Sequence, residues 1–406
     1  MSEYLLRTAT DGDLDALARL RRDAFGVPGD PDPADSGRTV TEPARTHVIE
    51  HAGQLVGVVA IFTRDLAVPG GVLPVAHVTG VAVNAAHTRR GLLRRMITEQ
   101  LRTAPEAVAA LWASEGRIYQ RFGYGLASQN VAMRADRREV SVLAPPAPGN
   151  LRAAVPADAI QELSQVYSRV LPTRPGWSSR NETWWKHLTS DPAARREGRT
   201  AERAVLFENP DGVVDGYARY RITPGWDDNG PKQEVNVTEV VAATPTAYAE
   251  LYRFLLRIDL ARTVAQGLSS VDEALFYLVD EPRRLGGKVA DGLWVRIIDL
   301  PRALTARRYA APVDVVFEVT DDLLEANTGR WRLRAGAGGA LVTCTRADGE
   351  PDFSLDIADL GAAFLGGTPL GALHQAGRIR EHRPGAVAAT STAFGWPVAP
   401  NSIEIF

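Results

Sequence analysis

The sequence predicts an α+β protein built from two or three domains. Its 406 residues are too many for one hydrophobic core. A short apolar run that ends at Val83 precedes a basic, glycine-bearing loop and a helical pattern that begins at Leu92. In residues 313–406, short strand patterns come first and helical patterns follow. Strands and helices are therefore mixed in both regions, which favours several α+β domains.

Strand and helix patterns follow one another through the N-terminal part. The predicted elements are a strand over residues 4–8, a helix that begins at Asp11 or Asp13, and strands near residues 46–50 and 54–64. Residues 26–38 form a loop that is too long for a plain connector, which we expect to be functional or disordered. The proline-rich stretch 144–149 is expected to close this part as a linker.

The C-terminal part shows a different order of elements. The predicted strands cover residues 313–319, 330–335, 341–346 and 352–356, and the predicted helices lie near residues 356–366 and 370–376. The single cysteine, Cys344, lies in an apolar strand pattern and is expected to belong to the core.

Residues 79–94, Thr-Gly-Val-Ala-Val-Asn-Ala-Ala-His-Thr-Arg-Arg-Gly-Leu-Leu-Arg, predict a binding site for a pyrophosphate. A strand, a loop and a helix in this order direct backbone N–H groups toward one point, where the helix N-terminus adds partial positive charge. Arg89, Arg90 and Arg94 add full charges. Gly91 lets the backbone approach the phosphates without a side chain in the way.

The spacing of this loop departs from the usual acyl-CoA loop, Arg/Gln-x-x-Gly-x-Gly/Ala. Thr88 stands at its first position and Leu93 at its last. The alternative interpretation is an ordinary strand–turn–helix connection with a solvated basic turn. A second motif downstream favours the binding site.

This second motif contains a candidate general acid. Residues 110–114 predict a buried strand, and residues 115–124 predict a short helix that ends at Gly123. Tyr119 stands four residues before the Gly123–Tyr124 pair. Gcn5-related N-acetyltransferases (GNATs) hold their general acid beside the CoA sulfur in a similar pattern. The alternative is a core tyrosine that packs on Phe122.

The two motifs together resemble the enhanced-intracellular-survival (Eis) acetyltransferases of actinobacteria. The resemblance rests on Val-Ala-Val, on His-Thr-Arg-Arg-Gly-Leu-Leu-Arg, on Ser-Glu-Gly-Arg-Ile-Tyr-Gln-Arg-Phe-Gly-Tyr-Gly, and on a chain end at Phe406. It implies an α+β chain with a catalytic GNAT domain over residues 1–143, a degenerate GNAT domain over 150–295, and a sterol-carrier-protein-like domain over 300–406. It also implies acetyl-CoA-dependent acetylation of amines, including those of aminoglycosides, by a homohexamer.

The resemblance assigns the site residues. The expected acetyl-CoA contacts are Val81, Ala82, Val83, Arg89, Arg90, Gly91, Leu92, Leu93, Arg94, Ser114 and Glu115. A neutral amine attacks the thioester directly, and Tyr119, neutral at pH 7, donates a proton to the leaving sulfur. The base is the terminal carboxylate of Phe406. An α-carboxyl has a pKa of about 3.3–3.7, so it needs desolvation or a relaying water.

The amine pocket is less clearly indicated. A polycationic substrate needs carboxylates nearby, and the candidates are Asp23, beside Phe25, and Glu404. Solvated surface acids are an equally good interpretation of both. Family members usually carry a glutamate directly before the terminal phenylalanine, where this chain has Ile405. The tail residues Ile403, Ile405 and Phe406 are too apolar for a solvated, frayed end.

A faint internal repeat supports the second GNAT domain. Residues 238–253 align without gaps to residues 79–94, but Glu250 replaces Gly91, and Tyr248 and Ala249 replace Arg89 and Arg90. A carboxylate repels a pyrophosphate, so the second copy is expected to fold but not to bind CoA. Chance similarity between two strand–helix units is the alternative.

Composition excludes several other classes of protein. The net charge of −3 implies no general affinity for nucleic acid. No apolar run approaches the length of a membrane span, and the N-terminus does not resemble a signal peptide, so a cytoplasmic enzyme without a membrane partner is expected. One cysteine excludes an internal disulfide, and the seven histidines show no metal-ligand spacing, so no metal is expected.

Two further functions stay open at this point. The chain could be a protein-lysine or polyamine acetyltransferase instead of an enzyme for small polycations. It could also be a non-catalytic acetyl-CoA-binding regulator, although Tyr119 together with Phe406 argues against this. A thiol-release assay with a panel of amines separates these possibilities.

Overall fold

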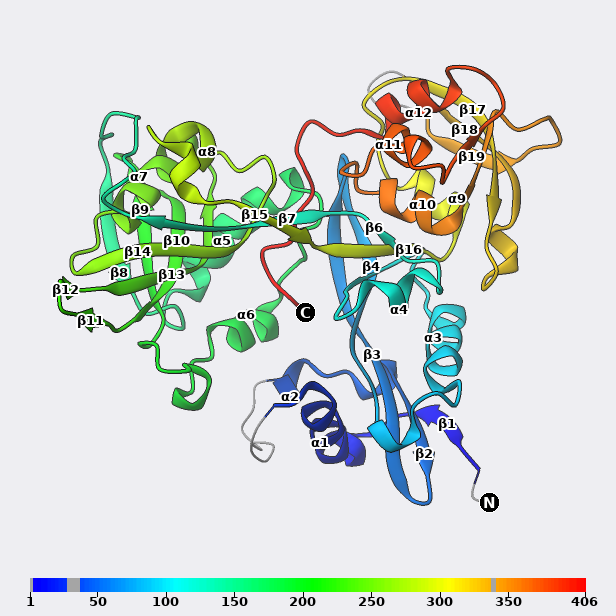
Figure 1. The fold of residues 1–406 in the computed structure, drawn as a ribbon, viewed down its shortest axis with the longest axis horizontal. Coiled ribbons are helices and arrows are strands. Elements are labelled where there is room, and N and C mark those ends of the chain that lie inside the picture. Colours follow the sequence, from blue (N-terminus) through cyan, green and yellow to red (C-terminus); the bar gives the residue numbers. More distant parts are fainter. Residues whose placement is uncertain (1–2, 28–36, 337–340) are drawn as a thin grey trace. The chain divides into compact units, whose positions relative to one another are not determined.

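The computed structural model forms two compact units, each of which contains a seven-stranded β-sheet (Figure 1). The residues that it describes are 3–27, 37–336 and 341–406. Unit 1 comprises Met1–Ser128, Gly292–Pro397 and Ile405–Phe406, and unit 2 comprises Gln129–Asp291 and Val398–Glu404.

A seven-stranded sheet, the first sheet, forms the N-terminal part of unit 1. Its strands follow the order β1 (Leu5–Thr8), β2 (Thr46–His51), β3 (Gln54–Val68), β4 (Gly71–Val83), β5 (Val108–Trp112), β16 (Leu293–Ile297) and β6 (Gly125–Leu126). Neighbouring strands are antiparallel except β4 and β5, which are parallel. The connection between parallel strands is the crossover helix α3 (Leu92–Thr103).

Helices cover both faces of the first sheet. α3 buries its apolar positions in a cluster with Val59, whereas α1 (Leu14–Phe25) packs Leu17 and Leu20 against Val58. Side chains of successive strand residues point to opposite faces, so α1 and α3 lie on opposite sides. The short helices α2 (Gly37–Val40) and α4 (Gly116–Gln120) complete this part.

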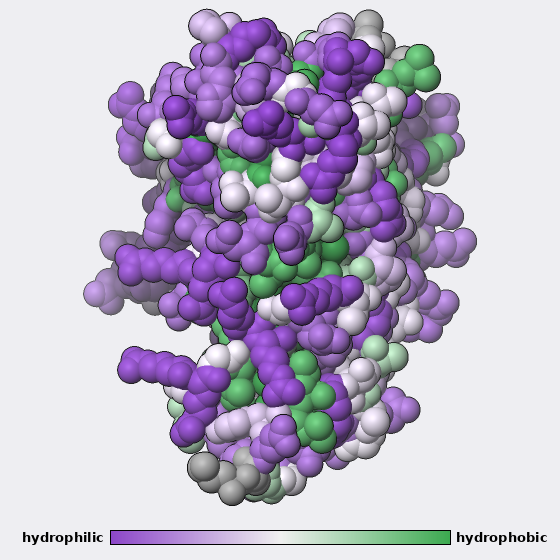
Figure 2. All heavy atoms as spheres, turned by 90° about the vertical axis from the view of Figure 1, so that its right-hand side faces the viewer, coloured by the Kyte–Doolittle hydropathy of each residue, from purple (hydrophilic) through white to green (hydrophobic). Residues whose placement is uncertain are grey.

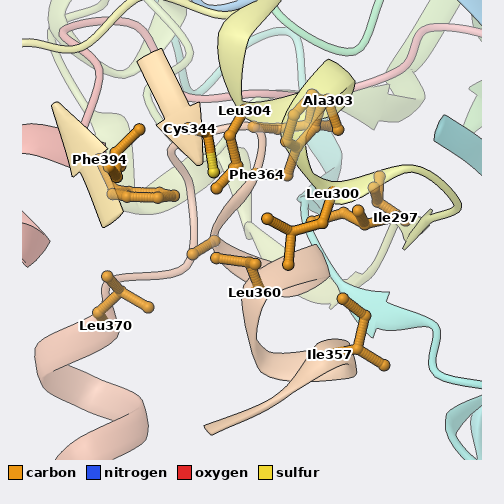
Figure 3. Close-up of a cluster of buried hydrophobic side chains, with 14 of the residues drawn as sticks. Ile297, Leu300, Ala303, Leu304, Cys344, Ile357, Leu360, Phe364, Leu370 and Phe394 are labelled. Carbon is orange, nitrogen blue, oxygen red and sulfur yellow. The ribbon is translucent and has the colours of Figure 1, made fainter. Parts of the chain in front are cut away.

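The C-terminal part of unit 1 shares a hydrophobic core with the first sheet. Its five strands follow the order β19 (Thr343–Arg346), β18 (Gly329–Ala335), β17 (Val313–Thr320), β20 (Phe353–Asp356) and β21 (Arg380–Glu381). The helices are α9 (Leu300–Thr305), α10 (Ile357–Ala363), α11 (Leu370–Gln375) and α12 (Ala386–Phe394). Leu360, Phe364 and Phe394 converge on this core, and Cys344 is buried with them, as predicted (Figure 3).

Unit 2 contains the second sheet. Its strands follow the order β15 (Lys288–Asp291), β7 (Gln129–Asp136), β14 (Ala261–Ser269), β13 (Gln233–Ala242), β10 (Val214–Thr223), β9 (Arg203–Glu208) and β8 (Asn150–Ala154). A small hairpin joins β11 (Trp226–Asp227) and β12 (Gly230–Pro231), and the helices are α5 (Ile160–Val170), α6 (Glu182–Thr189), α7 (Pro245–Leu255) and α8 (Leu275–Leu278). β13 and β14 are parallel and α7 connects them, so unit 2 repeats the strand–helix–strand arrangement of β4, α3 and β5.

Two strands belong to a sheet far from their sequence neighbours. β16 lies between β5 and β6 in the first sheet, and β7 lies between β15 and β14 in the second. The sequence analysis expected neither placement, because these pairings join residues more than a hundred positions apart.

The other predicted elements agree with the structure. The strands and helices predicted in residues 4–25, 46–64 and 313–376 are confirmed, and α12 was missed. Most of the predicted loop at residues 26–38 lies outside the described residues, and α2 begins at Gly37. Hydrophilic residues dominate the face of unit 1 turned to the viewer in Figure 2, with apolar residues in small patches. Within the described ranges, no helix is long and apolar enough to cross a membrane.

Candidate active site

The parallel strands β4 and β5 separate after a short paired stretch. Their register joins Ala76–His77 to Ala109–Ala110, although β4 continues to Val83 and β5 to Trp112. A cavity of about 340 Å³, the strand pocket, opens beside the separated ends. Its lining residues are Phe25, Val78, Thr79, Gly80, Val81, Trp112, Ala113, Ser114, Tyr119, Ile405 and Phe406. Strand edges that have left their ladder offer N–H and C=O groups to an amide-containing ligand.

A bulge in β4 shapes one wall of the strand pocket. Val58 of β3 pairs with Ala82 and Ala60 pairs with Thr79, so β4 carries an extra residue between these pairs. Gly80 lies at this bulge with a φ of 57°, a left-handed conformation that favours glycine.

A second cavity of about 460 Å³, the loop pocket, lies at the N-terminus of α3. It is lined by Val83, His87, Thr88, Arg89, Gly91, Leu92, Leu93, Arg94, Arg121 and Phe122. Gly91 precedes α3 with a φ of 76° and brings no capping side chain. The first N–H groups of a helix have no partner within it, so those of α3 are available to an anion.

The charges around the loop pocket are positive. Arg89 and Arg94 line it as predicted, whereas Arg90 is not among its lining residues. Arg121 lines it instead: its Nε donates a hydrogen bond to the Ile118 carbonyl at 3.1 Å, and its guanidinium lies 5.1 Å from the centre of the Phe122 ring. The sequence analysis missed Arg121, since nothing local distinguishes it from other basic residues.

Tyr119 lies in the short helix α4 and lines the strand pocket. Its side chain is only 5% exposed, and burial raises the pKa of its hydroxyl to about 12. The Tyr124 ring packs edge-on against it with ring centres 5.9 Å apart. Gly123 ends this turn with a φ of 79°, and a methyl group there would lie 2.8 Å from Arg296 Cζ. Tyr119 is therefore a neutral donor held at the pocket.

Phe406 brings the end of the chain to the same pocket. Its ring lies 4.5 Å from the ring of His77, between centres, and is partly buried. The prediction of a buried apolar tail is wrong for Ile405, which is 68% exposed although it lines the pocket. The strand pocket is thus lined both by Tyr119, the predicted general acid, and by Phe406, the predicted source of the base.

The remaining predicted cofactor residues separate into two groups. Val81 and Ser114 line the strand pocket, and Val83, Leu92 and Leu93 line the loop pocket. Ala82 and Glu115 line neither. Ala82 belongs to the cluster beneath α1, and Glu115 precedes α4.

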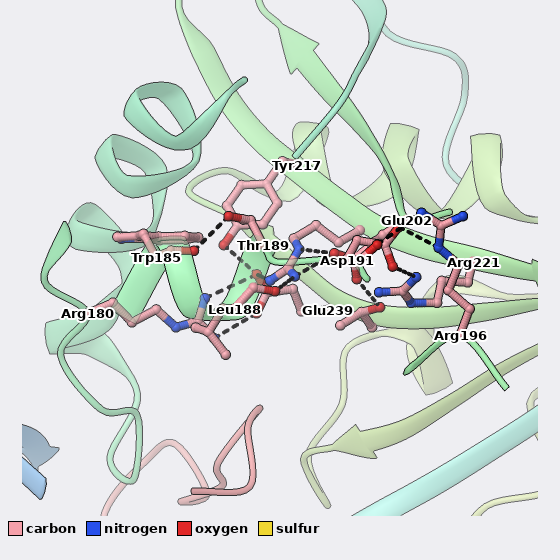
Figure 4. Close-up of polar contacts among 12 residues, drawn as sticks. Arg180, Trp185, Leu188, Thr189, Asp191, Arg196, Glu202, Tyr217, Arg221 and Glu239 are labelled. Carbon is pink, nitrogen blue, oxygen red and sulfur yellow. Dashed lines mark hydrogen bonds and ion pairs between the residues drawn. The ribbon is translucent and has the colours of Figure 1, made fainter. Parts of the chain in front are cut away.

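Of the predicted acceptor residues, only Phe25 lines the strand pocket. Asp23 is exposed and is not among its lining residues. Glu404 is buried in unit 2, where its carboxylate pairs with Arg180 at 2.7 Å. Arg180 also pairs with Glu239 at 2.8 Å, in a network that includes Tyr217 (Figure 4). The structure therefore gives Glu404 an ionic partner of its own.

Comparisons with known proteins identify the family of the chain. Two models described as acetyltransferase (GNAT) domains match residues 6–127 and 176–297, and a sterol carrier protein domain model matches residues 300–401. The N-acetyltransferase Eis of Mycobacterium bovis is 34% identical over 340 residues, which cover 80% of each chain. The chain belongs to the Eis family of N-acetyltransferases. An uncharacterized N-acetyltransferase of Streptomyces avermitilis is 41% identical over 369 residues, which cover 89% of this chain and 90% of the relative.

Solved structures support the same assignment for this Eis-family chain. The crystal structure of Eis1 from Mycobacterium abscessus matches with a TM-score of 0.84 and 30% identity, and all of both chains is covered. A GCN5-related N-acetyltransferase from Anabaena variabilis matches equally well, with a TM-score of 0.85, but its 19% identity shows the fold alone. The predicted α+β fold of two GNAT domains and a sterol-carrier-like domain is confirmed.

The second GNAT domain of this Eis-family enzyme lacks the loop of the first. β13 ends at Ala242 and α7 begins at Pro245, so the residues that align with 86–91 are helical. The Thr244 side chain caps Ala247 N–H. The prediction that Glu250 stands at a vacant phosphate position is corrected: it lies in the second turn of α7.

Glu250 has partners within unit 2. Its Oε1 accepts a hydrogen bond from Ala147 N–H at 3.0 Å, and Arg253 Nε donates to it at 3.3 Å. Arg253 also donates to the Ala144 carbonyl. The proline-rich stretch 144–149 is thereby fixed against α7, beside the residues that the alignment pairs with the CoA loop.

GNAT acetyltransferases use acetyl-CoA, and the residues of the first GNAT domain fit this group. The loop pocket combines an uncapped helix N-terminus with three arginines, and its lining in the described chain includes no acid. Both pockets adjoin the end of β4, since Val81 lines the strand pocket and Val83 lines the loop pocket.

Proposed function

We propose that this chain transfers an acetyl group from acetyl-CoA to a primary amine of a small molecule in the first GNAT domain. The observation that carries the proposal is the strand pocket, where Tyr119 and Phe406 line one cavity together with the separated ends of β4 and β5. This arrangement would supply a proton donor, a terminal carboxylate and backbone groups at one cavity.

Two sets of residues would hold acetyl-CoA. The first N–H groups of α3, together with Arg89 and Arg94, would hold the pyrophosphate. The open edge of β4 at Val81 would hold the pantetheine arm. When bound, acetyl-CoA supplies the acetyl group as an activated thioester.

Tyr119 acts as the general acid in this proposal. Its hydroxyl stays neutral at pH 7, because burial raises its pKa to about 12, and it donates its proton to the departing sulfur. The Phe406 carboxylate accepts a proton from the attacking amine, directly or through a water. Among the described residues that line the strand pocket there is no cysteine, and Ser114 stands in no nucleophile motif, so the amine itself makes the attack.

The pocket supports a small acceptor. Its volume is about 340 Å³, and among the described residues no acidic side chain lines it. Among the described residues, a polycation such as an aminoglycoside would find the terminal carboxylate as its one counter-charge there. We therefore propose a small primary amine as the acceptor and keep aminoglycosides, polyamines and lysine side chains as arms of the test.

A thiol-release assay tests the proposal. Purified protein is incubated with acetyl-CoA and a panel of amines, and the Tyr119→Phe variant is compared with the matched Tyr277→Phe variant, whose tyrosine is 83% exposed on α8. Amine-dependent thiol release that Tyr119→Phe lowers and Tyr277→Phe preserves supports the proposal. Binding of acetyl-CoA without thiol release for any amine would favour a regulator.

We also propose a homohexamer, on the family resemblance alone. The chain has a mass of 43.9 kDa. Light scattering is expected to report about six times this mass, and a mass near one chain would refute the assembly.

A further inference from the structure

The turn that follows α4 is built on the backbone of Tyr119. The Tyr119 carbonyl accepts the backbone N–H of Phe122 at 3.0 Å and that of Tyr124 at 3.3 Å. The ring of Tyr124 also packs edge-on against the ring of Tyr119. The position of the Tyr119 hydroxyl at the strand pocket therefore depends on what holds this turn in place.

Two glycines let β16 and α10 approach this turn closely. A methyl group on Gly123 would lie 2.8 Å from Arg296 Cζ in β16 and 2.9 Å from Ile357 Cγ2 in α10. A methyl group on Gly125 would lie 1.8 Å from the carbonyl oxygen of Ala358, which is also in α10. A side chain at either position would overlap these atoms, so the backbone of the turn lies directly against α10.

The helix α10 is itself held close to the first sheet. Gly361 lies one helical turn after Ile357, and a methyl group on it would lie 2.4 Å from the Val295 carbonyl oxygen of β16. α10 therefore packs on β6 and β16 with backbone against backbone (Figure 1). The sterol carrier protein domain model matches residues 300–401, so the helix that supports the Tyr119 turn belongs to the C-terminal domain.

The C-terminal domain also holds the guanidinium that lies beside Gly123. Arg296 Nη2 donates to both carboxylate oxygens of Asp321, at 2.7 and 2.8 Å, and both side chains are buried. Asp321 accepts further hydrogen bonds from the Asn327 side chain at 2.9 Å and from Leu324 N–H at 3.0 Å. Several hydrogen bonds on one carboxylate restrict its position, so Arg296 is a second support of the turn.

We propose that Ile357 on α10 is a positioning residue for Tyr119. Its side chain holds the Gly123 turn in the conformation that places the Tyr119 hydroxyl at the strand pocket. The C-terminal domain thereby takes part in acetyl transfer, because proton donation depends on the distance and orientation of the donor. This inference rests on the proposed acetyltransferase function and adds a residue of the C-terminal domain to it.

Matched substitutions in one hydrophobic core provide the first test. Ile357→Ala removes the Cγ2 methyl group beside Gly123, whereas Ile357→Val keeps a branched Cβ there. Ile379→Ala is the control, since Ile379 is buried in the same core but lies after α11. Ile357→Ala should lower kcat by about tenfold or more, the order of effect of a slightly misplaced catalytic group. Ile357→Val and Ile379→Ala should stay near the wild-type value, and equal kcat in the two alanine variants would overturn the proposal.

A double-mutant cycle separates positioning from general damage to the fold. Tyr119→Phe has no hydroxyl left to misplace, so Ile357→Ala should lower kcat much less in this background than in the wild type. A purely structural role of Ile357 predicts the same factor in both backgrounds, and that result would overturn the proposal.

Hydrogen exchange gives a readout that does not need turnover. The backbone N–H groups of Phe122 and Tyr124 should exchange faster in Ile357→Ala and at the wild-type rate in Ile379→Ala. Unchanged exchange in Ile357→Ala would refute its positioning role and leave the acetyltransferase function intact. Absence of thiol release with every amine would contradict the proposed function, while the exchange rates still decide whether α10 orders the turn.

Discussion

The two GNAT domains build the same strand–helix–strand unit with different connections. In the first, residues 84–91 separate β4 from α3 and leave the helix N-terminus uncapped. In the second, α7 begins at Pro245, directly after its Thr244 cap. The sheet and the crossover helix tolerate both connections, because packing depends on the apolar faces. Anion binding depends on the loop, so we expect the second domain to keep the fold without the anion site.

The two domains also differ in the tyrosine that follows the second strand of this unit, β5 in the first domain and β14 in the second. Tyr119 follows β5 and is buried at the strand pocket, whereas Tyr277 follows β14 and is 83% exposed. A tyrosine that lines a cofactor pocket can be positioned to donate its proton to a thiolate there, whereas a solvent-exposed tyrosine is not. Comparable positions in the two domains therefore carry the same residue type with different chemistry.

The largest effect is expected at the chain end, which lines a pocket of the first domain. Deleting Phe406 should nearly abolish turnover and leave CoA binding intact, because the carboxylate moves away from the pocket. A short C-terminal extension should be equally harmful, since it converts the acid into an amide. Phe406→Leu, which keeps the carboxylate, should be milder. Full kcat/KM in a C-terminally tagged enzyme would show that this carboxylate has no catalytic role.

The next largest effect is expected on kcat, where substitution of Tyr119 and of Tyr277 should give different results. Tyr119→Phe should lower kcat by about 10²–10⁴-fold with unchanged CoA affinity, the usual weight of a general acid. Tyr277→Phe should leave both values unchanged. Steady-state kinetics and calorimetry provide the two readouts, and near-normal kcat for Tyr119→Phe would reassign this residue to packing.

The pH dependence sharpens the role of Tyr119. Burial raises its pKa to about 12, so the donating form persists through the alkaline range in which the enzyme can be assayed. The kcat profile should therefore show no loss from tyrosine ionisation below about pH 11. A decline near pH 10 that disappears in Tyr119→Phe would contradict this environment.

A smaller effect is expected in the second domain. If charge alone prevented binding there, Glu250→Gln would create a second acetyl-CoA site. The structure predicts that it does not, because the loop itself is missing. The substitution should lower the stability by about 1–3 kcal/mol, since Glu250 is buried and accepts hydrogen bonds from Ala147 and Arg253. Thermal unfolding measures the change in stability, and calorimetry measures acetyl-CoA binding. A new binding site in Glu250→Gln would show that the charge of Glu250 alone prevents binding in the second domain.

Local patterns predicted most of the first domain. The strand, the basic loop and the helix start at Leu92 were visible because glycine, arginine and apolar residues have their local preferences there. The short helix that contains Tyr119 and ends at Gly123 could be predicted for the same reason. Cys344 was correctly placed in the core from its apolar strand.

Non-local contacts could not be predicted in this way. β16 enters the first sheet from residues 293–297, and no local signal in that strand specifies its partners. Arg121 reaches the loop pocket because it directly follows α4 in the folded chain. The sequence made Glu404 a candidate for substrate binding, but in the structure its carboxylate pairs with Arg180. Each of these depends on which distant segments meet.

The central claim is that the loop at residues 84–91 makes the first GNAT domain alone a binder of acetyl-CoA. Isothermal titration with acetyl-CoA tests this most directly, on the wild type and on Arg89→Glu, which reverses a charge at the loop pocket. The account predicts one site per chain in the wild type and no measurable binding in the variant. Two equivalent sites per chain, or unchanged binding in Arg89→Glu, would contradict it.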